Sequence, residues 1–108
     1  MTLSVCVICR NEEPNIRRCL ESATWTDEII VVDAMSQDKT VEIARKYTDK
    51  VYQKAWPGYV DQKNFAISKA HGSWILSMDA DEEITATLRD EILGEIKKDD
   101  AKGGYRIP

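Results

Sequence analysis

The sequence predicts an α/β domain with a Rossmann-like, open and mostly parallel sheet. Short apolar segments rich in Val and Ile, at residues 3–9, 28–33 and 74–78, are typical of strands buried on both faces. Segments with apolar residues at helical spacing lie between them. This alternation implies right-handed crossovers and helices on both faces of the sheet. In the commonest strand order, the first and fourth strands lie side by side where the winding reverses.

The chain has 108 residues, which is enough for one domain over residues 1–108. Its net charge of -4 argues against a nucleic-acid partner, because such binding needs a basic face. No apolar run approaches the ~20 residues of a membrane span, and the first residues do not resemble a signal peptide. Three cysteines, an odd number, fit a reducing compartment. We therefore expect a cytoplasmic domain.

The first half of the chain contains two predicted strand–helix units. The strand at residues 3–9 leads through a loop with Pro14 into a helix that reaches about residue 22. The strand at residues 28–33 leads into a second helix, for which Ser36 and Asp38 are candidate caps. The apolar residues expected to bury these helices are Ile16, Cys19, Leu20, Ala23, Val41, Ile43, Ala44 and Tyr47.

The second half continues the pattern. A brief strand at residues 50–53 is followed by a helix from about Tyr59, with Gly72 as its expected C-cap. After the strand at residues 74–78, Thr85 is a cap for a helix to about residue 98, whose apolar residues are Leu88, Ile92 and Ile96. Residues 105–108 begin like a strand and the chain stops there, so we expect a partial domain truncated on its C-terminal side.

Polar residues follow three of the predicted strands. Arg10 and Asn11 follow the first, Asp33 ends the second, and Asp79-Ala80-Asp81 ends the fourth. Because the carboxyl ends of parallel strands share one edge, these residues should converge on one crevice. Two aspartates one residue apart offer oxygens to a hard cation that also takes phosphate oxygens. We interpret them as a metal–diphosphate corner. The alternative is an ordinary turn with solvated acids.

Several other functions fit less well. A dinucleotide dehydrogenase needs a glycine-rich first turn, and residues 10–13 contain no glycine. An aspartyl-phosphate phosphatase also uses Asp-x-Asp, but on its first strand.

Cys6 and Cys9 should point to opposite faces of a strand, which disfavours a shared metal. Trp25 and Trp56 are interpreted as packing residues, with stacking on a sugar or base as the alternative.

A nucleotide-sugar transferase uses all three strand ends, because a cation would neutralise the departing diphosphate. The motifs at residues 4–13, 30–33, 36–40, 62–64 and 77–82 resemble those of family 2 glycosyltransferases of the GT-A fold, in their amino-terminal, donor-binding half. The chain is especially similar to the branch that adds sugars to the lipopolysaccharide core.

The resemblance implies roles for individual residues. Asp33 would pair with a uracil-like base, and Lys63 would reach the base or a phosphate. Asp79 would bind the ribose. Asp81 would coordinate Mn or Mg bridging the diphosphate. Asn11 and Glu13 in the first loop, and Asp38 in the second, would line the nucleotide pocket or hold these loops.

The chain departs from the family at Met35, where small residues are usual, and a bulky side chain there would crowd the nucleotide. The resemblance also places the catalytic base beyond residue 108. Glu82 or Glu83 could replace it, but a polar loop before a helix is the simpler interpretation. His71 is read as a helix-end residue.

We therefore expect the donor-binding part of a transferase that moves a sugar from a nucleotide diphosphate, typically UDP, to a saccharide or lipid-linked acceptor, as in lipopolysaccharide or envelope glycan synthesis. A lipid-linked acceptor would bring the full enzyme to a membrane surface. The alternatives are a fragment that binds nucleotide and metal without turnover, and a structural fragment blocked by Met35. An exposed sheet edge would favour a homodimer.

Overall fold

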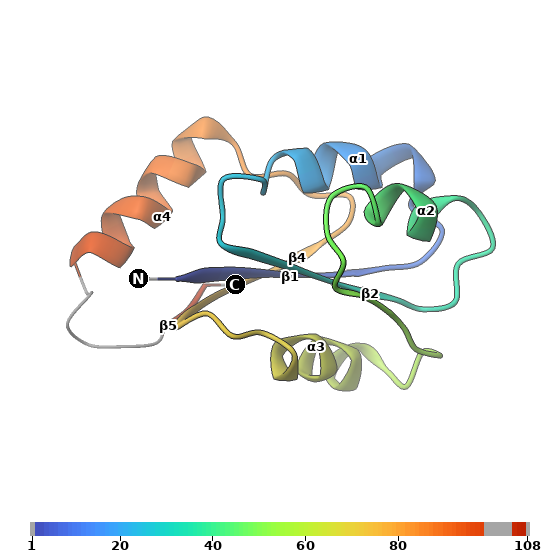
Figure 1. The fold of residues 1–108 in the computed structure, drawn as a ribbon. Coiled ribbons are helices and arrows are strands. Elements are labelled where there is room, and N and C mark those ends of the chain that lie inside the picture. The colour runs from blue at the N-terminus through green and yellow to red at the C-terminus, as the bar shows by residue number, and fades with distance from the viewer. Residues whose placement is uncertain (1, 99–104, 108) are drawn as a thin grey trace.

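The computed structural model describes residues 2–98 and 105–107. These residues form a parallel sheet in the order β3-β2-β1-β4-β5 (Figure 1). The strands are β1 (Leu3–Cys9), β2 (Glu28–Asp33), β3 (Val51–Gln53), β4 (Trp74–Asp79) and β5 (Tyr105–Ile107). As predicted, β1 lies between β2 and β4. Cys9 pairs with Asp33, and Ile8 pairs with Asp79, so the carboxyl ends of these three strands meet at one edge.

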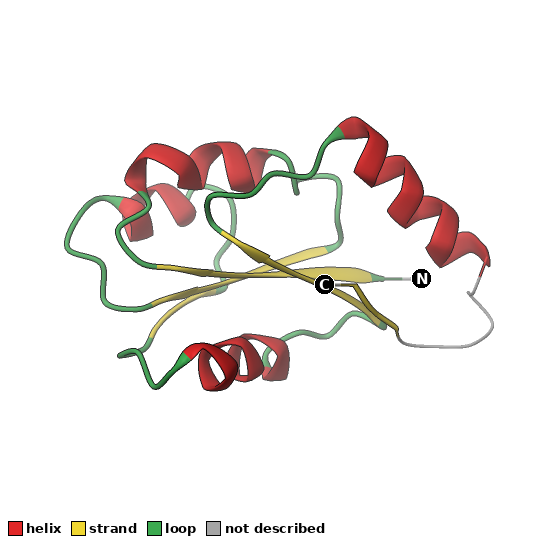
Figure 2. Ribbon diagram, turned by 180° about the vertical axis from the view of Figure 1, so that it is seen from behind, coloured by secondary structure: helices red, strands yellow, loops and turns green. Residues whose placement is uncertain are grey.

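The helices cover the two faces of the sheet unequally. Helices α1 (Glu13–Glu21), α2 (Thr40–Ala44) and α4 (Ala86–Lys98) lie on one face, and α3 (Tyr59–Ser68) lies on the other (Figures 1 and 2). The larger apolar cluster accordingly joins one side of β1, β2 and β4 to α1, α2 and α4. The smaller cluster joins the opposite side of β1 and β2 to Ala66 of α3.

Every residue of β1 is buried, as expected for a central parallel strand. Its side chains alternate between the two clusters, so Cys6 and Cys9 lie on opposite faces of the sheet. All three cysteines are buried free thiols. Burial raises the pKa of Cys19 to about 12, and burial together with the nearby Asp33 also raises the pKa of Cys9. These thiols are therefore core residues that resist ionisation.

The predicted caps were partly right. Thr85 is confirmed, because its hydroxyl accepts a hydrogen bond of 3.1 Å from the Leu88 amide in the first turn of α4. The prediction that Gly72 caps α3 was wrong, since α3 ends four residues earlier, at Ser68. Gly72 instead allows a close approach: a Cβ atom there would lie 2.6 Å from Oγ of Ser4.

The apolar face predicted for α4 is confirmed for Ile92 and Ile96, which are buried against the larger cluster. Leu88 was expected to join them but is exposed. No helix in the described part of the chain is long and apolar enough to cross a bilayer. β5 lies at one edge of the sheet, and pairing of such an edge with a second copy stays a prediction.

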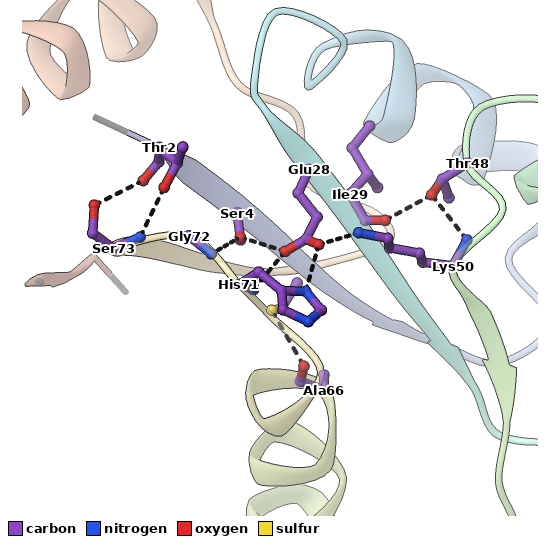
Figure 3. A network of polar contacts seen from close by, with 11 residues as sticks. Thr2, Ser4, Glu28, Ile29, Thr48, Lys50, Ala66, His71, Gly72 and Ser73 are labelled. Atoms are coloured by element: carbon purple, nitrogen blue, oxygen red, sulfur yellow. Dashed lines mark hydrogen bonds and ion pairs between the residues drawn. The ribbon is translucent and has the colours of Figure 1, made fainter.

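The amino-terminal edge of the sheet is tied together by Glu28 at the start of β2 (Figure 3). Its carboxylate accepts hydrogen bonds from the Ser4 hydroxyl at 2.6 Å and the His71 amide at 2.7 Å. It also forms ion pairs with Lys50 and, at 3.0 Å, with the His71 ring when that ring is protonated. One side chain thus links the segments that begin four strands.

Candidate functional site

A hollow of about 330 Å³ lies at the carboxyl edge of the sheet. It opens between the ends of β1 and β4, where the winding of the chain reverses and α/β folds usually bind ligands. It is lined by residues at the end of β1 and directly after it, residues at the end of β4 and directly after it, and two aromatic residues, one before α3 and one at its first position. They are Ile8, Cys9, Arg10, Glu12, Trp56, Tyr59, Asp79, Ala80 and Asp81.

Two other hollows, of about 320 and 180 Å³, lie at the amino-terminal edge around Glu28 and Lys50. There, Glu28 and Lys50 pair with each other, and the Thr48 hydroxyl bonds the Ile29 carbonyl at 2.8 Å. The polar groups of Glu28, Lys50 and Thr48 are therefore engaged within the protein (Figure 3). We assign the functional site to the hollow at the carboxyl edge, which combines the topological position with unpaired acidic groups.

The acidic corner at the end of β4 is a closed turn. The Asp79 amide donates a hydrogen bond of 2.7 Å to Oε1 of Glu82, and the Glu82 amide donates one of 3.0 Å to the Asp79 carbonyl. Burial raises the pKa of Asp79, and the negative charges of Glu82 and Asp81 raise it further, whereas Lys63 opposes the shift. Negative charge is therefore concentrated here beyond what one nearby lysine offsets.

The predicted metal ligand Asp81 is exposed and lines the hollow next to Asp79. Among the described residues, no group of three or more His, Cys, Asp or Glu side chains is placed to hold a metal by itself. The oxygen donors and their mutual repulsion fit a cation such as Mg²⁺, which is commonly held by one or two carboxylates together with substrate phosphates. The residues present are thus suited to a cation shared with a ligand.

Asp33, the predicted base-binding residue, is fully buried at the end of β2. Its Oδ2 accepts a hydrogen bond of 2.7 Å from the Ser36 amide, and its Oδ1 accepts one from the Ser36 hydroxyl. The Cys9 thiol lies 3.5 Å from the same Oδ1. In this arrangement Asp33 holds the turn that follows β2, and contact with a base would require these bonds to open.

The loop after β1 and the loop after β2 are joined by a clasp of reciprocal hydrogen bonds. The Asn11 amide donates to the Ser36 hydroxyl at 2.7 Å, while the Gln37 amide donates to Oδ1 of Asn11 at 2.8 Å. The Glu12 amide donates to the Thr40 hydroxyl at 2.9 Å. These bonds cross from one strand end to the other, so they fix the rim of the hollow.

Glu13 and Asp38 complete this clasp. The Glu13 amide donates to Oδ2 of Asp38 at 3.1 Å, and the Lys39 amide donates to Oε1 of Glu13 at 3.0 Å. Loss of hydration acts to raise the pKa of Asp38, but hydrogen bonds from the Thr40 hydroxyl, the Thr40 amide and the Glu13 amide outweigh it and lower that pKa. The two acids predicted to be near the nucleotide therefore bond backbone amides of the opposite loop.

Lys63 lies one helical turn after Tyr59 in α3, with its Nζ 5.6 Å from the centre of the Tyr59 ring. Tyr59 lines the hollow, so the lysine charge lies beside it. Met35 is half exposed and has a φ of 59°, the left-handed conformation that glycine adopts most easily. It is not among the residues that line the hollow, and crowding of a nucleotide by its side chain stays a prediction.

Three weaker predictions are settled by their contacts. Glu82 bonds the Asp79 amide, and Glu83 lies 3.9 Å from Arg18, as expected for a polar loop before a helix. The helix-end role predicted for His71 was wrong, because α3 ends at Ser68; His71 lies at the opposite edge from the hollow, beside Glu28. Trp25 packs against the larger core cluster, as predicted.

Sequence reasoning gave too little weight to the aromatic residues. Trp56 was interpreted as a packing residue, but it is half exposed and lines the hollow. Tyr59 was seen only as a helix start. A signal was present, because two aromatic residues flank Pro57-Gly58 directly before a helix, in a loop with no apolar periodicity to explain them.

The comparison with known proteins decides the family of this chain and its fold. The family model described as glycosyl transferase family 2 matches residues 4–104. The chain belongs to glycosyl transferase family 2. Its similarity to solved structures gives it the GT-A fold: it matches residues 1–349 of TarS from S. aureus with a TM-score of 0.78 and 29% identity, over 93% of this chain and 33% of that one.

Other family 2 relatives resemble the chain over most of its length. It is 48% identical to an uncharacterized glycosyltransferase of Rickettsia typhi, over 83% of this chain and 31% of that protein. It is 32% identical to the lipopolysaccharide core biosynthesis glycosyltransferase LpsC of Rhizobium meliloti, over 99% of this chain and 42% of that protein. The chain thus spans less than half the length of these relatives.

Proposed function

We propose that this glycosyltransferase domain binds the donor of a metal-dependent sugar transfer, from a nucleotide diphosphate sugar to a saccharide or lipid-linked acceptor. The observation that carries the proposal is the hollow between the ends of β1 and β4, with Asp79 and Asp81 on its lining. The S. aureus TarS structure in complex with UDP-GlcNAc has the same fold, with a TM-score of 0.73 and 28% identity. This supports a uridine diphosphate sugar as donor, and the likeness to LpsC supports an acceptor in lipopolysaccharide or envelope glycan synthesis.

In this proposal Asp81 would hold a Mn or Mg ion that the donor diphosphate shares. The bound cation would supply Lewis-acid stabilisation of the diphosphate as it leaves. Asp79 accepts hydrogen bonds from the ribose. Arg10 lines the hollow and Lys63 lies beside its Tyr59, so both add positive charge near the place proposed for the diphosphate. Among the described residues Arg10 forms no ion pair with Glu12 or Glu13, so its charge is available to a phosphate.

The clasp residues act indirectly. Asn11, Glu13 and Asp38 fix the two loops at the rim, and Asp33 holds the turn after β2, so they present backbone and neighbouring side chains to the nucleotide. Direct pairing of Asp33 with the base is a second step, available only when its bonds to Ser36 open.

A second function, binding without turnover, is favoured by one observation. Glu82 and Glu83 were the two glutamates that the sequence offered as a base. Glu82 accepts the hydrogen bond that closes the turn after β4, and Glu83 is a surface residue that faces Arg18. We therefore propose that residues 1–108 bind donor and cation, and that deprotonation of the acceptor needs a carboxylate from beyond them.

Titration calorimetry with UDP, with and without Mn²⁺, tests both functions. We expect wild-type binding that requires Mn²⁺ and is lost in Asp81→Ala. The matched control is Asp90→Ala, which removes an exposed acid from α4 and should bind as wild type does. Absence of wild-type binding would refute the donor-site proposal. Turnover of UDP-sugar by this chain alone would refute binding without catalysis.

A further inference from the structure

The segment from Trp56 to Val60 has an unusual surface. Six large hydrophobic side chains are exposed among residues 2–98, and three of them, Trp56, Tyr59 and Val60, fall within these five positions. Single exposed apolar residues need no explanation, but a concentration in one short loop beside a hollow marks an interaction site. Trp56 and Tyr59 line the hollow, whereas Val60 does not.

The backbone holds this segment in place. Gly58 has a φ of 120°, which side-chain-bearing residues rarely adopt, and it directly precedes the first residue of α3. The Gln62 amide bonds the Gly58 carbonyl at 3.0 Å, so the loop is continuous with the helix. At its other end, the Lys54 amide bonds the Asp33 carbonyl at 2.8 Å. The two aromatic residues are therefore presented from anchored backbone.

From these observations we propose that Trp56 and Tyr59 form a stacking wall for the nucleoside base of the donor, an inference that rests on the proposed function. The donor consists of a base, a ribose, a diphosphate and the transferred sugar, and the ribose is already assigned to Asp79. The diphosphate belongs at Asp81, where a cation and oxygen ligands suit it. The transferred sugar is rimmed by hydroxyls that would lose hydrogen bonds against an apolar wall. The base has a flat π face, which stacks well on an aromatic side chain.

Charge around the wall fits the same occupant. The Lys63 ammonium lies over the Tyr59 ring, so a positive charge stands beside the wall, where it would suit the anionic part of a nucleotide. The lining also carries Asp79 and Glu12, whose oxygens can accept hydrogen bonds from ribose hydroxyls. Selection among bases would then depend on polar contacts at the rim, because stacking tolerates any base.

Binding of UMP, UDP and pyrophosphate in Mn²⁺ tests this wall in Trp56→Leu and Trp56→Phe, with Val60→Ala as the exposed neighbour that does not line the hollow. We expect Trp56→Leu to weaken UMP and UDP binding by the same factor, ~10- to 100-fold, and to leave pyrophosphate binding unchanged. Trp56→Phe should retain most of the affinity, and Val60→Ala all of it.

Unchanged UDP affinity in Trp56→Leu would overturn the wall while leaving the proposed function intact. So would a loss confined to UDP-sugar, which would assign the aromatic residues to the sugar ring. Failure of the wild type to bind UDP would instead refute the proposed function itself. Circular dichroism of each variant distinguishes loss of binding from loss of folding.

Discussion

Asn11 accepts a hydrogen bond of 2.8 Å from the Gln37 amide through its side-chain oxygen, while its own amide bonds the Ser36 hydroxyl. Asn11 also has a φ of 52°, a left-handed conformation that asparagine tolerates better than most residues. One residue therefore both shapes the loop after β1 and ties it to the loop after β2.

Asn11 substitutions should separate these two contributions. Asn11→Gly keeps the left-handed backbone and removes the bond to Gln37, so we expect a loss of about 0.5–1.5 kcal/mol in the free energy of unfolding. Asn11→Ala also adds backbone strain, for a total loss of about 2–3 kcal/mol. Urea unfolding measures both. Equal stabilities of the two variants would show that the backbone conformation at this position is unimportant.

Met35 also has a left-handed backbone, with a φ of 59°. Unlike Asn11, its side chain is exposed, so burial of that side chain adds little stability to offset the strain. Met35→Gly should raise the free energy of unfolding by about 0.5–1 kcal/mol, since relief of left-handed strain exceeds the entropy that glycine adds to the unfolded chain. Met35→Ala keeps the strain and should be close to wild type. A destabilised glycine variant would show that the Met35 side chain makes a stabilising contact.

The ionised Asp79 side chain is repelled by neighbouring carboxylates, and a neutral side chain at this position would remove that repulsion. Burial, Glu82 and Asp81 all raise its pKa, so its ionised form is less stable here than that of a free aspartate. We expect Asp79→Asn to raise the free energy of unfolding at pH 7 by about 0.5–1 kcal/mol and to weaken nucleotide binding. At pH 3, where Asp79 is protonated, the stability gain should vanish. A gain that persists at pH 3 would have a source other than charge.

Glu28 should make the free energy of unfolding depend on pH in the acidic range. Burial acts to raise its pKa, but hydrogen bonds from Lys50, Ser4 and His71 lower it from 4.5 to about 2. A carboxylate with a lowered pKa stabilises the fold above its unfolded value, and that stabilisation is lost as pH falls from about 4.5 to about 2.

In the Glu28→Gln variant this acid-dependent part of the unfolding free energy, about 1–3 kcal/mol, should be absent. The variant should be less stable than wild type at pH 7 and approach it at pH 2. Thermal unfolding across this range measures the difference. Asp90→Asn is the control, because Asp90 is an exposed acid that lies on α4. Parallel pH profiles for wild type and Glu28→Gln would contradict the assignment.

Much of the fold was predictable because local and global signals agree. Strands with uninterrupted Val and Ile must be buried on both faces, and polar residues after three such strands must then share an edge. The convergence of Arg10, Asp79 and Asp81 on one hollow follows from that topology, but the prediction was wrong for Asn11 and Asp33, which do not line it. Strand bounds for β2 were equally predictable, since Asp33 ends the apolar run.

The finer geometry was not predictable, because it depends on contacts between distant segments. Nothing local shows that Asn11 reaches Gln37 across 26 positions. Gly72 was taken for a helix cap because glycine often ends helices, but its small size serves contact with Ser4. The error at Gly72 came from assigning a local role to a residue whose role is tertiary.

The central claim is that nucleotide and cation bind at the carboxyl edge of the sheet. Amide chemical shifts in ¹⁵N-labelled protein, recorded during titration with UDP and Mg²⁺, locate the ligand directly. We predict the largest shifts at residues 10–13, 56–59 and 79–82, with Thr48, Lys50 and Gly72 unchanged. Shifts concentrated instead around Thr48, Lys50 and Gly72, at the amino-terminal edge, would contradict the account.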